Sequence, residues 1–194
     1  CYTNMVELHN NIKGENNMIP IFNSKRQYDE IGADVEKAVC EVLRSGAYIL
    51  GPNAKSLETE LAEYIGVKYT VGLNSGTDAL HLALRALDIG KGDEVITTAF
   101  TFVATAEAIG IVGAKPVFVD CESDSYNIDA EKIQRAITKR TKAVVAVHLY
   151  GQPANLTVIK KICNENNLFL IEDAAQAHIA EYKNKKVGTF GDVS

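Results

Sequence analysis

Asp173 is the first side chain in this sequence with an evident capacity for chemistry, because it follows the apolar run LFLIE at the end of an expected strand. A partly buried carboxylate needs a partner. It either caps the following turn and bonds nearby hydroxyls, or pairs with a protonated heterocyclic nitrogen and keeps that ring cationic as an electron sink. Gln176 and His178 follow closely and either face the same cavity or are plain polar loop residues.

A second candidate site is the turn formed by Ser75, Gly76 and Thr77, which lies between the apolar run YTVGL and the helical pattern DALHLALRAL. Gly76 permits close backbone approach, and the free N–H groups at a helix start favour a phosphate, with the two hydroxyls as extra donors. A plain Ser/Thr helix cap explains the same residues equally well.

Fingerprints of other ligands are missing. The GK[ST] ending of a P-loop is absent, and the glycine turn at 90–92 does not continue as GxGxxG, because Val95 occupies the third glycine position. The acidic run 120–131 mimics an EF-hand, but Ser125 stands where that loop needs glycine. We therefore expect no metal, and we expect reduced, buried thiols without CxxC spacing. The cysteines are Cys1, Cys40, Cys121 and Cys163.

Aromatic and histidine side chains follow two other expected strands. Phe100 and Phe102 come after EVITT, where one ring could stack on an aromatic ligand, although core packing is the usual role of phenylalanine. His148 and Tyr150 end the run AVVAVHLYG. Ligands of open α/β sheets collect beyond the carboxyl ends of the strands, so these positions are candidates for the same site.

The composition restricts the partners. The chain has 194 residues, 46% hydrophobic and 23% charged, with a net charge of −5, which is typical of an ordinary globular protein. An acidic protein without a basic patch is not expected to bind nucleic acid. No apolar run approaches the roughly 18 residues of a membrane span, so we expect no membrane association and a cytoplasmic location.

The elements that position these residues follow from hydrophobic periodicity. Helices are expected over 27–44, ended by Gly46, and over 54–65. Beyond them, short apolar runs alternate with helical ones, which predicts an α/β three-layer sandwich with a mostly parallel sheet. A hairpin is expected over 181–188, centred on Asn184 and Lys185. The expected strands are YTVGL, EVITT, PVFVD, AVVAVHL and LFLIEDA, with helices over 77–88, 101–112, 129–138 and 155–166 between them.

The two ends of the chain differ from its centre. Residues 1–17 are asparagine-rich with little apolar periodicity, so we expect a poorly ordered leader. Residues 18–194 form the organised part. Because the sequence begins at Cys1 rather than Met and stops at Ser194 straight after a glycine-rich turn, we expect this domain to be incomplete.

Taken together, six stretches resemble a known family. In order they are GAYILGP, SGTDALHLAL, GDEVITTAFTFVATAEAI, SYNID, VHLYGQPA and IEDAAQAHIAEYKNKKVGTFGD. Their order and spacing are similar to those of the DegT/DnrJ/EryC1/StrS family of sugar-nucleotide aminotransferases. The resemblance covers about residues 18–194 and implies the large domain of a fold-type-I enzyme that depends on pyridoxal 5'-phosphate.

The resemblance also implies roles for individual residues. Asp173 would pair with the pyridine nitrogen, Gln176 would hydrogen-bond the phenolic oxygen, and Phe102 would stack on the ring. The phosphate would bind at the turn 75–77, through Gly76 and Thr77 above all. His178 belongs to the last motif and is carried over as a catalytic position supporting the cofactor.

The implied reaction transfers an amino group, typically from glutamate, to a keto group of a nucleotide-linked deoxysugar, in a homodimer. Such enzymes need an aldimine lysine, which in the family lies shortly beyond GTFGD and so beyond Ser194. Lys183, Lys185 and Lys186 belong to the expected hairpin and do not match that lysine. We therefore expect this fragment alone to be inactive, and its small C-terminal domain to be absent.

Two alternatives remain open. In a sugar dehydratase relative, which uses the same cofactor as PLP or PMP, a histidine replaces the lysine, and only residues beyond Ser194 would separate the two. A noncatalytic protein that binds a partner through its dimer surface, without turnover, is the other alternative; it predicts no cofactor binding.

Overall fold

The computed structural model describes residues 20–194, so the expected leader over 1–17 lies outside the described residues. The chain divides after Gly51 into two compact units. In the first, α2 (Ser24–Ser45) confirms the expected helix and begins three residues earlier. The Asn23 side chain accepts a hydrogen bond from the Arg26 N–H at the helix start, and Gly46 ends the helix with a left-handed φ of 68°.

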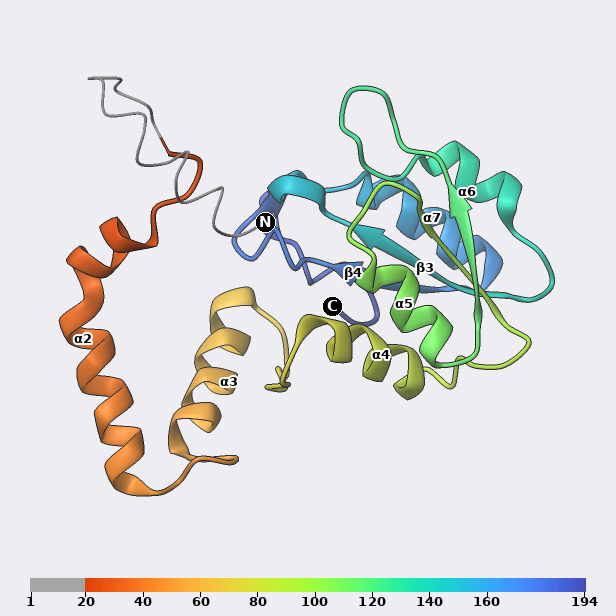
Figure 1. Cartoon of the computed structure of the whole chain (residues 1–194). Coiled ribbons are helices and arrows are strands. Elements are labelled where there is room, and N and C mark those ends of the chain that lie inside the picture. Colours follow the sequence, from red (N-terminus) through yellow and green to blue (C-terminus); the bar gives the residue numbers. More distant parts are fainter. Residues whose placement is uncertain (1–19) are drawn as a thin grey trace, which may run out of the picture. The chain divides into compact units, whose positions relative to one another are not determined.

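The second unit contains the sheet and the remaining helices (Figure 1). Its first helix begins with proline, whose fixed φ suits the first turn. The helices are α3 (Pro52–Ile65), α4 (Gly76–Ala86), α5 (Ala104–Ile111), α6 (Ala130–Ala136) and α7 (Leu156–Asn166). The strands of the main sheet are β1 (Glu94–Thr98), β2 (Lys115–Val119), β3 (Thr141–Val147) and β4 (Phe169–Asp173).

The sheet is parallel and has the strand order β2-β1-β3-β4. Successive strand residues face opposite sides, so each buried strand supplies two cores. Val95, Val145 and Ile171 pack in the core that includes residues of α4 and α5. Ile96 and Leu170 pack in the core that includes residues of α6 and α7. The expected α/β three-layer sandwich is therefore confirmed in this unit.

The connections create a place for a ligand. From β1 the chain crosses through α5 to β2 on one side, whereas from β3 it crosses through α7 to β4 on the other. The loops that leave the adjacent strands β1 and β3 thus diverge above their carboxyl ends. Such a switch point is where open α/β sheets bind ligands.

The segment YTVGL, expected as a strand, is not one. Its polar groups bond to α3 instead: the Thr70 hydroxyl donates to the Glu58 carbonyl oxygen at 2.6 Å, and the Gly72 N–H donates to the Glu58 carboxylate at 2.8 Å. Tyr69 and Val71 are about three-quarters exposed. An apolar run becomes a strand only where a neighbouring strand pairs with it, and none of residues 20–194 does so here.

The expected hairpin is confirmed as β5 (Glu181–Tyr182) and β6 (Lys185–Lys186), which pair antiparallel. Its turn lies one residue earlier than expected, at Lys183 and Asn184, whose φ values are 51° and 62°. Two left-handed residues in a two-residue loop match the right-handed twist of the strands.

The expectation of buried thiols is wrong for Cys40, which is exposed on α2. Cys163 on α7 is buried, and burial, with a smaller contribution from the Asp192 carboxylate, raises the pKa of its thiol to about 12. Cys163 is therefore a neutral, unreactive core residue at physiological pH.

After the hairpin the chain returns to β4, where Val193 forms an isolated parallel bridge with Ile171 and the Asp192 N–H donates to the Leu170 carbonyl oxygen at 2.8 Å. A Cβ on Gly191 would lie 2.7 Å from that same oxygen. We expect Gly191→Ala to lower the free energy of unfolding by about 1–3 kcal/mol, because backbone must move to relieve the clash.

Gly110→Ala is the matched control, because a Cβ at this α5 position meets no atom within 4 Å. It should raise stability by about 0.5–1 kcal/mol through helix propensity. Urea denaturation measures both variants, and equal stabilities would contradict the close approach at Gly191.

Candidate functional site

Asp173 ends β4, where its half-buried carboxylate accepts two hydrogen bonds. The hydroxyl of Thr105, a buried residue of α5, donates to Oδ2 at 2.9 Å, and the Ala175 N–H donates to Oδ1 at 3.2 Å. Both donors are neutral, and no cationic side chain among residues 20–194 pairs with this carboxylate. The site therefore orients a negative charge and leaves it available to a cationic atom of a ligand.

Gln176 is fixed by the turn that follows β3. Its Oε1 accepts a hydrogen bond from the Tyr150 N–H at 2.7 Å, which leaves the amide NH₂ group to donate elsewhere. Tyr150 has a left-handed φ of 55°, and its side chain is 74% exposed. Strained backbone conformations occur often at functional sites, so we include Tyr150 and the turn after β3 in the candidate site.

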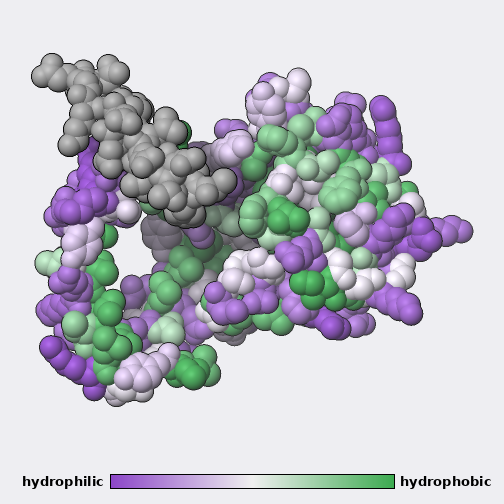
Figure 2. Space-filling view, viewed as in Figure 1, coloured by the Kyte–Doolittle hydropathy of each residue, from purple (hydrophilic) through white to green (hydrophobic). Residues whose placement is uncertain are grey.

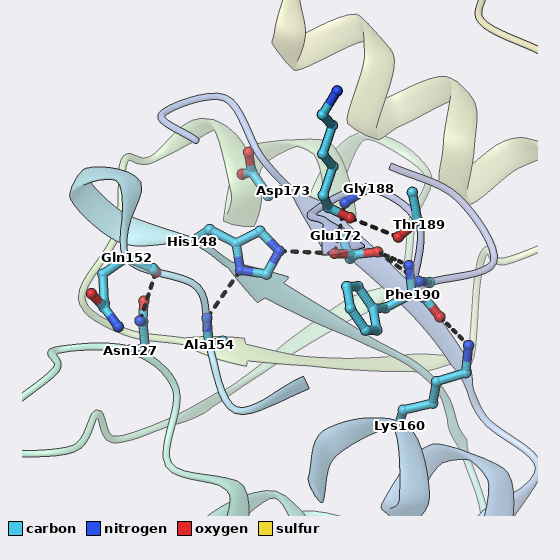
Figure 3. A network of polar contacts seen from close by, with 12 residues as sticks. Asn127, His148, Gln152, Ala154, Lys160, Glu172, Asp173, Gly188, Thr189 and Phe190 are labelled. Carbon is cyan, nitrogen blue, oxygen red and sulfur yellow. Dashed lines mark hydrogen bonds and ion pairs between the residues drawn. The ribbon is translucent and has the colours of Figure 1, made fainter. Parts of the chain in front are cut away.

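Asn127 holds the same turn from the other side and was not singled out from the sequence. Its buried amide accepts a hydrogen bond from the Leu149 N–H at 3.1 Å and donates to the Gln152 carbonyl oxygen at 2.8 Å (Figure 3). The only signal was its place in the SYNID stretch. A buried amide that satisfies two backbone groups fixes the path of a loop.

His148 lies directly after β3 and is completely buried. Its Nδ1 accepts a hydrogen bond from the Ala154 N–H at 3.1 Å, so that nitrogen carries no proton. The proton is therefore on Nε2, which donates to Glu172 Oε2 at 3.0 Å (Figure 3). His148 is a neutral donor in this network, because an imidazole that accepts at Nδ1 is not doubly protonated.

Glu172 precedes Asp173 and is the buried acceptor at the centre of this network (Figure 3). Besides His148, the N–H groups of Gly188, Phe190 and Gly191 donate to its carboxylate at 2.9, 2.8 and 2.6 Å. Burial alone would raise its pKa, but the hydrogen bonds from His148 and these N–H groups outweigh burial and lower it. Glu172 was not singled out from the sequence, although it is a charged residue within the apolar run LFLIE.

The turn before α4 both caps the helix and leaves donors free. The Ser75 hydroxyl accepts a hydrogen bond from the Asp78 N–H and donates to the Asp78 carboxylate, both at 3.1 Å. The N–H groups of Gly76 and Thr77 have no acceptor among residues 20–194, and a Cβ on Gly76 would meet open space. Two free amides at a helix start suit a phosphate, whereas the Ser75 hydroxyl is used by the cap.

The remaining candidates differ in their surroundings. The Phe100 ring packs against Tyr126 with 5.8 Å between centroids, whereas the Phe102 side chain, in the loop before α5, is 71% exposed. Phe102 is thus the ring available to a ligand. His178 is exposed and makes no hydrogen bond within the described part of the chain, so no hydrogen bond joins it to Asp173.

Hydrogen bonds join some of the candidate residues to one another but not others. Thr105 contacts Asp173 directly, and Gln176 contacts the turn after β3, whereas no hydrogen bond within residues 20–194 joins the start of α4 to Asp173. None of the helices described has the length and apolar character needed to cross a membrane. Over the same residues, no group of three or more His, Cys, Asp or Glu side chains could hold a metal ion.

Comparison with known proteins gives consistent matches. The model of the DegT/DnrJ/EryC1/StrS aminotransferase family matches residues 29–194. A pleiotropic regulatory protein of Geobacillus stearothermophilus is 46% identical over 89% of this chain and 46% of its own length. UDP-2-acetamido-2-deoxy-3-oxo-D-glucuronate aminotransferase of Pseudomonas aeruginosa is 46% identical over 87% of this chain and 47% of its own.

Solved structures agree with these matches. NtdA from Bacillus subtilis, with bound cofactor PMP, superimposes with a TM-score of 0.85 at 34% identity and covers 93% of this chain and 41% of that one. The chain spans about half the length of the curated relatives it matches.

Proposed function

Because this chain belongs to the DegT/DnrJ/EryC1/StrS aminotransferase family, we propose that its second unit binds pyridoxal 5'-phosphate in an aminotransferase acting on nucleotide sugars. The proposed reaction transfers an amino group, typically from glutamate, to a keto group of a nucleotide-linked deoxysugar. The names of relatives support this substrate class, since the Pseudomonas aeruginosa protein is named for a 3-oxo sugar attached to UDP.

The observation that carries the proposal is the Asp173 carboxylate, which two neutral donors orient and no cation in the described residues neutralises. When bound, the cofactor supplies a pyridine ring that accepts electrons from the carbon undergoing reaction. Asp173 would accept a hydrogen bond from the protonated ring nitrogen and hold the proton there. Thr105 would keep Oδ2 in place as that bond forms.

Other residues of the chain would bind the rest of the ligand. The free N–H groups of Gly76 and Thr77 would donate to the phosphate, with the positive end of the α4 dipole behind them. The exposed Phe102 ring would stack on the pyridine, and the Gln176 amide NH₂ would donate to the phenolic oxygen. For His178 we retain a supporting catalytic role near the cofactor, which its exposed position permits.

We also propose a homodimer in the cytoplasm. Apolar patches lie among hydrophilic residues on the visible face of the second unit (Figure 2). The exposed apolar residues of this unit include Tyr69 and Val71. A second copy could bury such residues. Cysteines without disulfide spacing suit a reducing compartment. Light scattering of the full-length protein tests the dimer, and a monomer would refute it.

The cofactor proposal is tested by titrating the full-length protein that contains this chain with pyridoxal 5'-phosphate. Saturable binding, seen as a change in the absorption and induced circular dichroism of the cofactor, is expected. Amino transfer from glutamate to a nucleotide-linked keto sugar is then measured by mass spectrometry of the sugar product. A protein that binds the cofactor without turnover would retain the site but lose the proposed reaction, and absence of binding would favour the noncatalytic alternative.

Gly76→Pro tests the phosphate site alone. Proline is tolerated at the first position of α4, and Ser75 has the extended φ and ψ of −157° and 159° that a residue before proline prefers. The substitution removes one N–H donor, so we expect the dissociation constant of pyridoxal 5'-phosphate to rise about tenfold with α4 intact.

Gly76→Ala is its control, because it keeps the N–H and its Cβ meets no atom within 4 Å. Fluorescence titration should give an affinity near that of the wild type. Equal affinities for the proline and alanine variants would place the phosphate elsewhere.

A further inference from the structure

The structure assigns Glu172 as a positioning residue of the candidate site. Its buried carboxylate holds the turn after β3 and the segment 188–191 against the end of β4, and thereby fixes Asp173. The assignment rests on the proposed function, because Asp173 is the group proposed to bind the cofactor. Glu172 acts through other residues, since successive strand residues face opposite sides and its side chain points away from that of Asp173.

The first connection runs through His148. Its Nε2 donates to Glu172, and its backbone N–H donates to the carbonyl oxygen of Asp173 at 3.0 Å. His148 also precedes the turn that contains Tyr150, whose N–H is bound by the Gln176 side chain. The Glu172 carboxylate is thus linked through one imidazole both to the backbone of Asp173 and to the turn that orients Gln176.

The second connection runs through residues 188–191. Three of their N–H groups converge on the two oxygens of Glu172, and a charged acceptor binds such donors more strongly than a neutral one does. The Glu172 N–H in turn donates to the Val193 carbonyl oxygen at 3.0 Å. Glu172 therefore holds residues 188–191 to β4 through its side chain, and holds the following Val193 through its backbone N–H.

If residue 172 served only to fill the core, an apolar side chain would serve better than the carboxylate of Glu172. Burying a carboxylate is costly, and an apolar side chain fills a core at lower cost, but only a polar network fixes loops in one direction. All four donors to Glu172 come from the two segments that flank the end of β4 (Figure 3). Glu94 is a useful contrast: it is also buried, but lies at the amino end of β1 and bonds to Thr138 and Arg140.

The test compares Glu172→Gln with Glu94→Gln in the full-length protein. Each substitution removes the charge of one buried strand glutamate at constant size, so both should lower stability. For Glu172→Gln we expect the dissociation constant of pyridoxal 5'-phosphate to rise about tenfold and the induced circular dichroism of the bound cofactor to change. For Glu94→Gln we expect less than about a twofold change in affinity. Equal changes in affinity for the two variants would overturn the positioning role.

A measurement on the wild type keeps the test decisive if Glu172→Gln does not fold. Coupling between sites is reciprocal, so cofactor binding should slow hydrogen exchange of the Gly188, Phe190 and Gly191 N–H groups about tenfold. Unchanged exchange on cofactor binding would also overturn the inference. A wild-type protein that binds no cofactor would instead remove the proposed function, and the inference with it.

Discussion

Asp173→Asn is expected to lower the rate of amino transfer by the full-length protein about 1,000-fold and to leave its fold intact, because a neutral amide does not hold a ring nitrogen protonated. The local hydrogen bonds survive the change. Asparagine Oδ1 can still accept from the Ala175 N–H, and the Thr105 hydroxyl can rotate to accept from the new NH₂ group. Steady-state kinetics and thermal unfolding measure the two effects.

Asp93→Asn is the control for charge removal. Asp93 is half-buried near the amino end of β1, where its carboxylate accepts a hydrogen bond from the Gly90 N–H at 3.0 Å. The same chemical change there should leave amino transfer within about twofold of the wild type. If Asp173→Asn kept the full rate of amino transfer, Asp173 would not belong to the proposed site. If Asp93→Asn also lost most of that rate, the loss in Asp173→Asn could not be assigned to the cofactor site.

Glu172→Ala should have the largest effect on stability of the changes considered, a loss of about 3–5 kcal/mol in the free energy of unfolding at pH 7. The substitution leaves the buried His148 imidazole and the N–H groups of three half-buried residues without their acceptor. Each unsatisfied donor retains its cost of desolvation. Denaturant unfolding of the wild type and the variant measures the difference.

The pH dependence of that difference identifies its cause. The hydrogen bonds lower the pKa of Glu172 in the folded protein below its ordinary value of 4.5. The Glu172 carboxylate therefore makes its full contribution to stability at pH values above 4.5. This contribution is lost as the pH falls through the lower pKa that Glu172 has in the folded protein. The difference between wild type and Glu172→Ala should shrink below about pH 4. A difference that stays constant into that acidic range would assign the loss to packing rather than to the carboxylate.

Much of the architecture followed from local sequence patterns. β1 has the bounds expected from EVITT, and α7 begins within one residue of the expected 155–166 helix. Both elements depend on hydrophobic periodicity within a few residues, which a sequence displays directly. The YTVGL strand failed for the opposite reason, because strand formation depends on a partner strand that local sequence does not reveal.

The candidate site shows the same division. Asp173 and the turn around Gly76 could be proposed as candidates from the sequence, because residues after strands and before helices are recognisable one at a time. The partners of Asp173 were not, since Thr105 lies 68 positions away and reaches it only through the packing of α5 on the sheet.

Local sequence patterns were enough to predict the alternation of strands and helices, the family resemblance and the place of Asp173 at the end of β4. The buried pair of Glu172 and His148, 24 positions apart, and the three N–H groups of residues 188–191 that complete it are evident only in the folded structure. A buried charge is stable only where several distant donors converge, and convergence is a property of the fold rather than of any local segment.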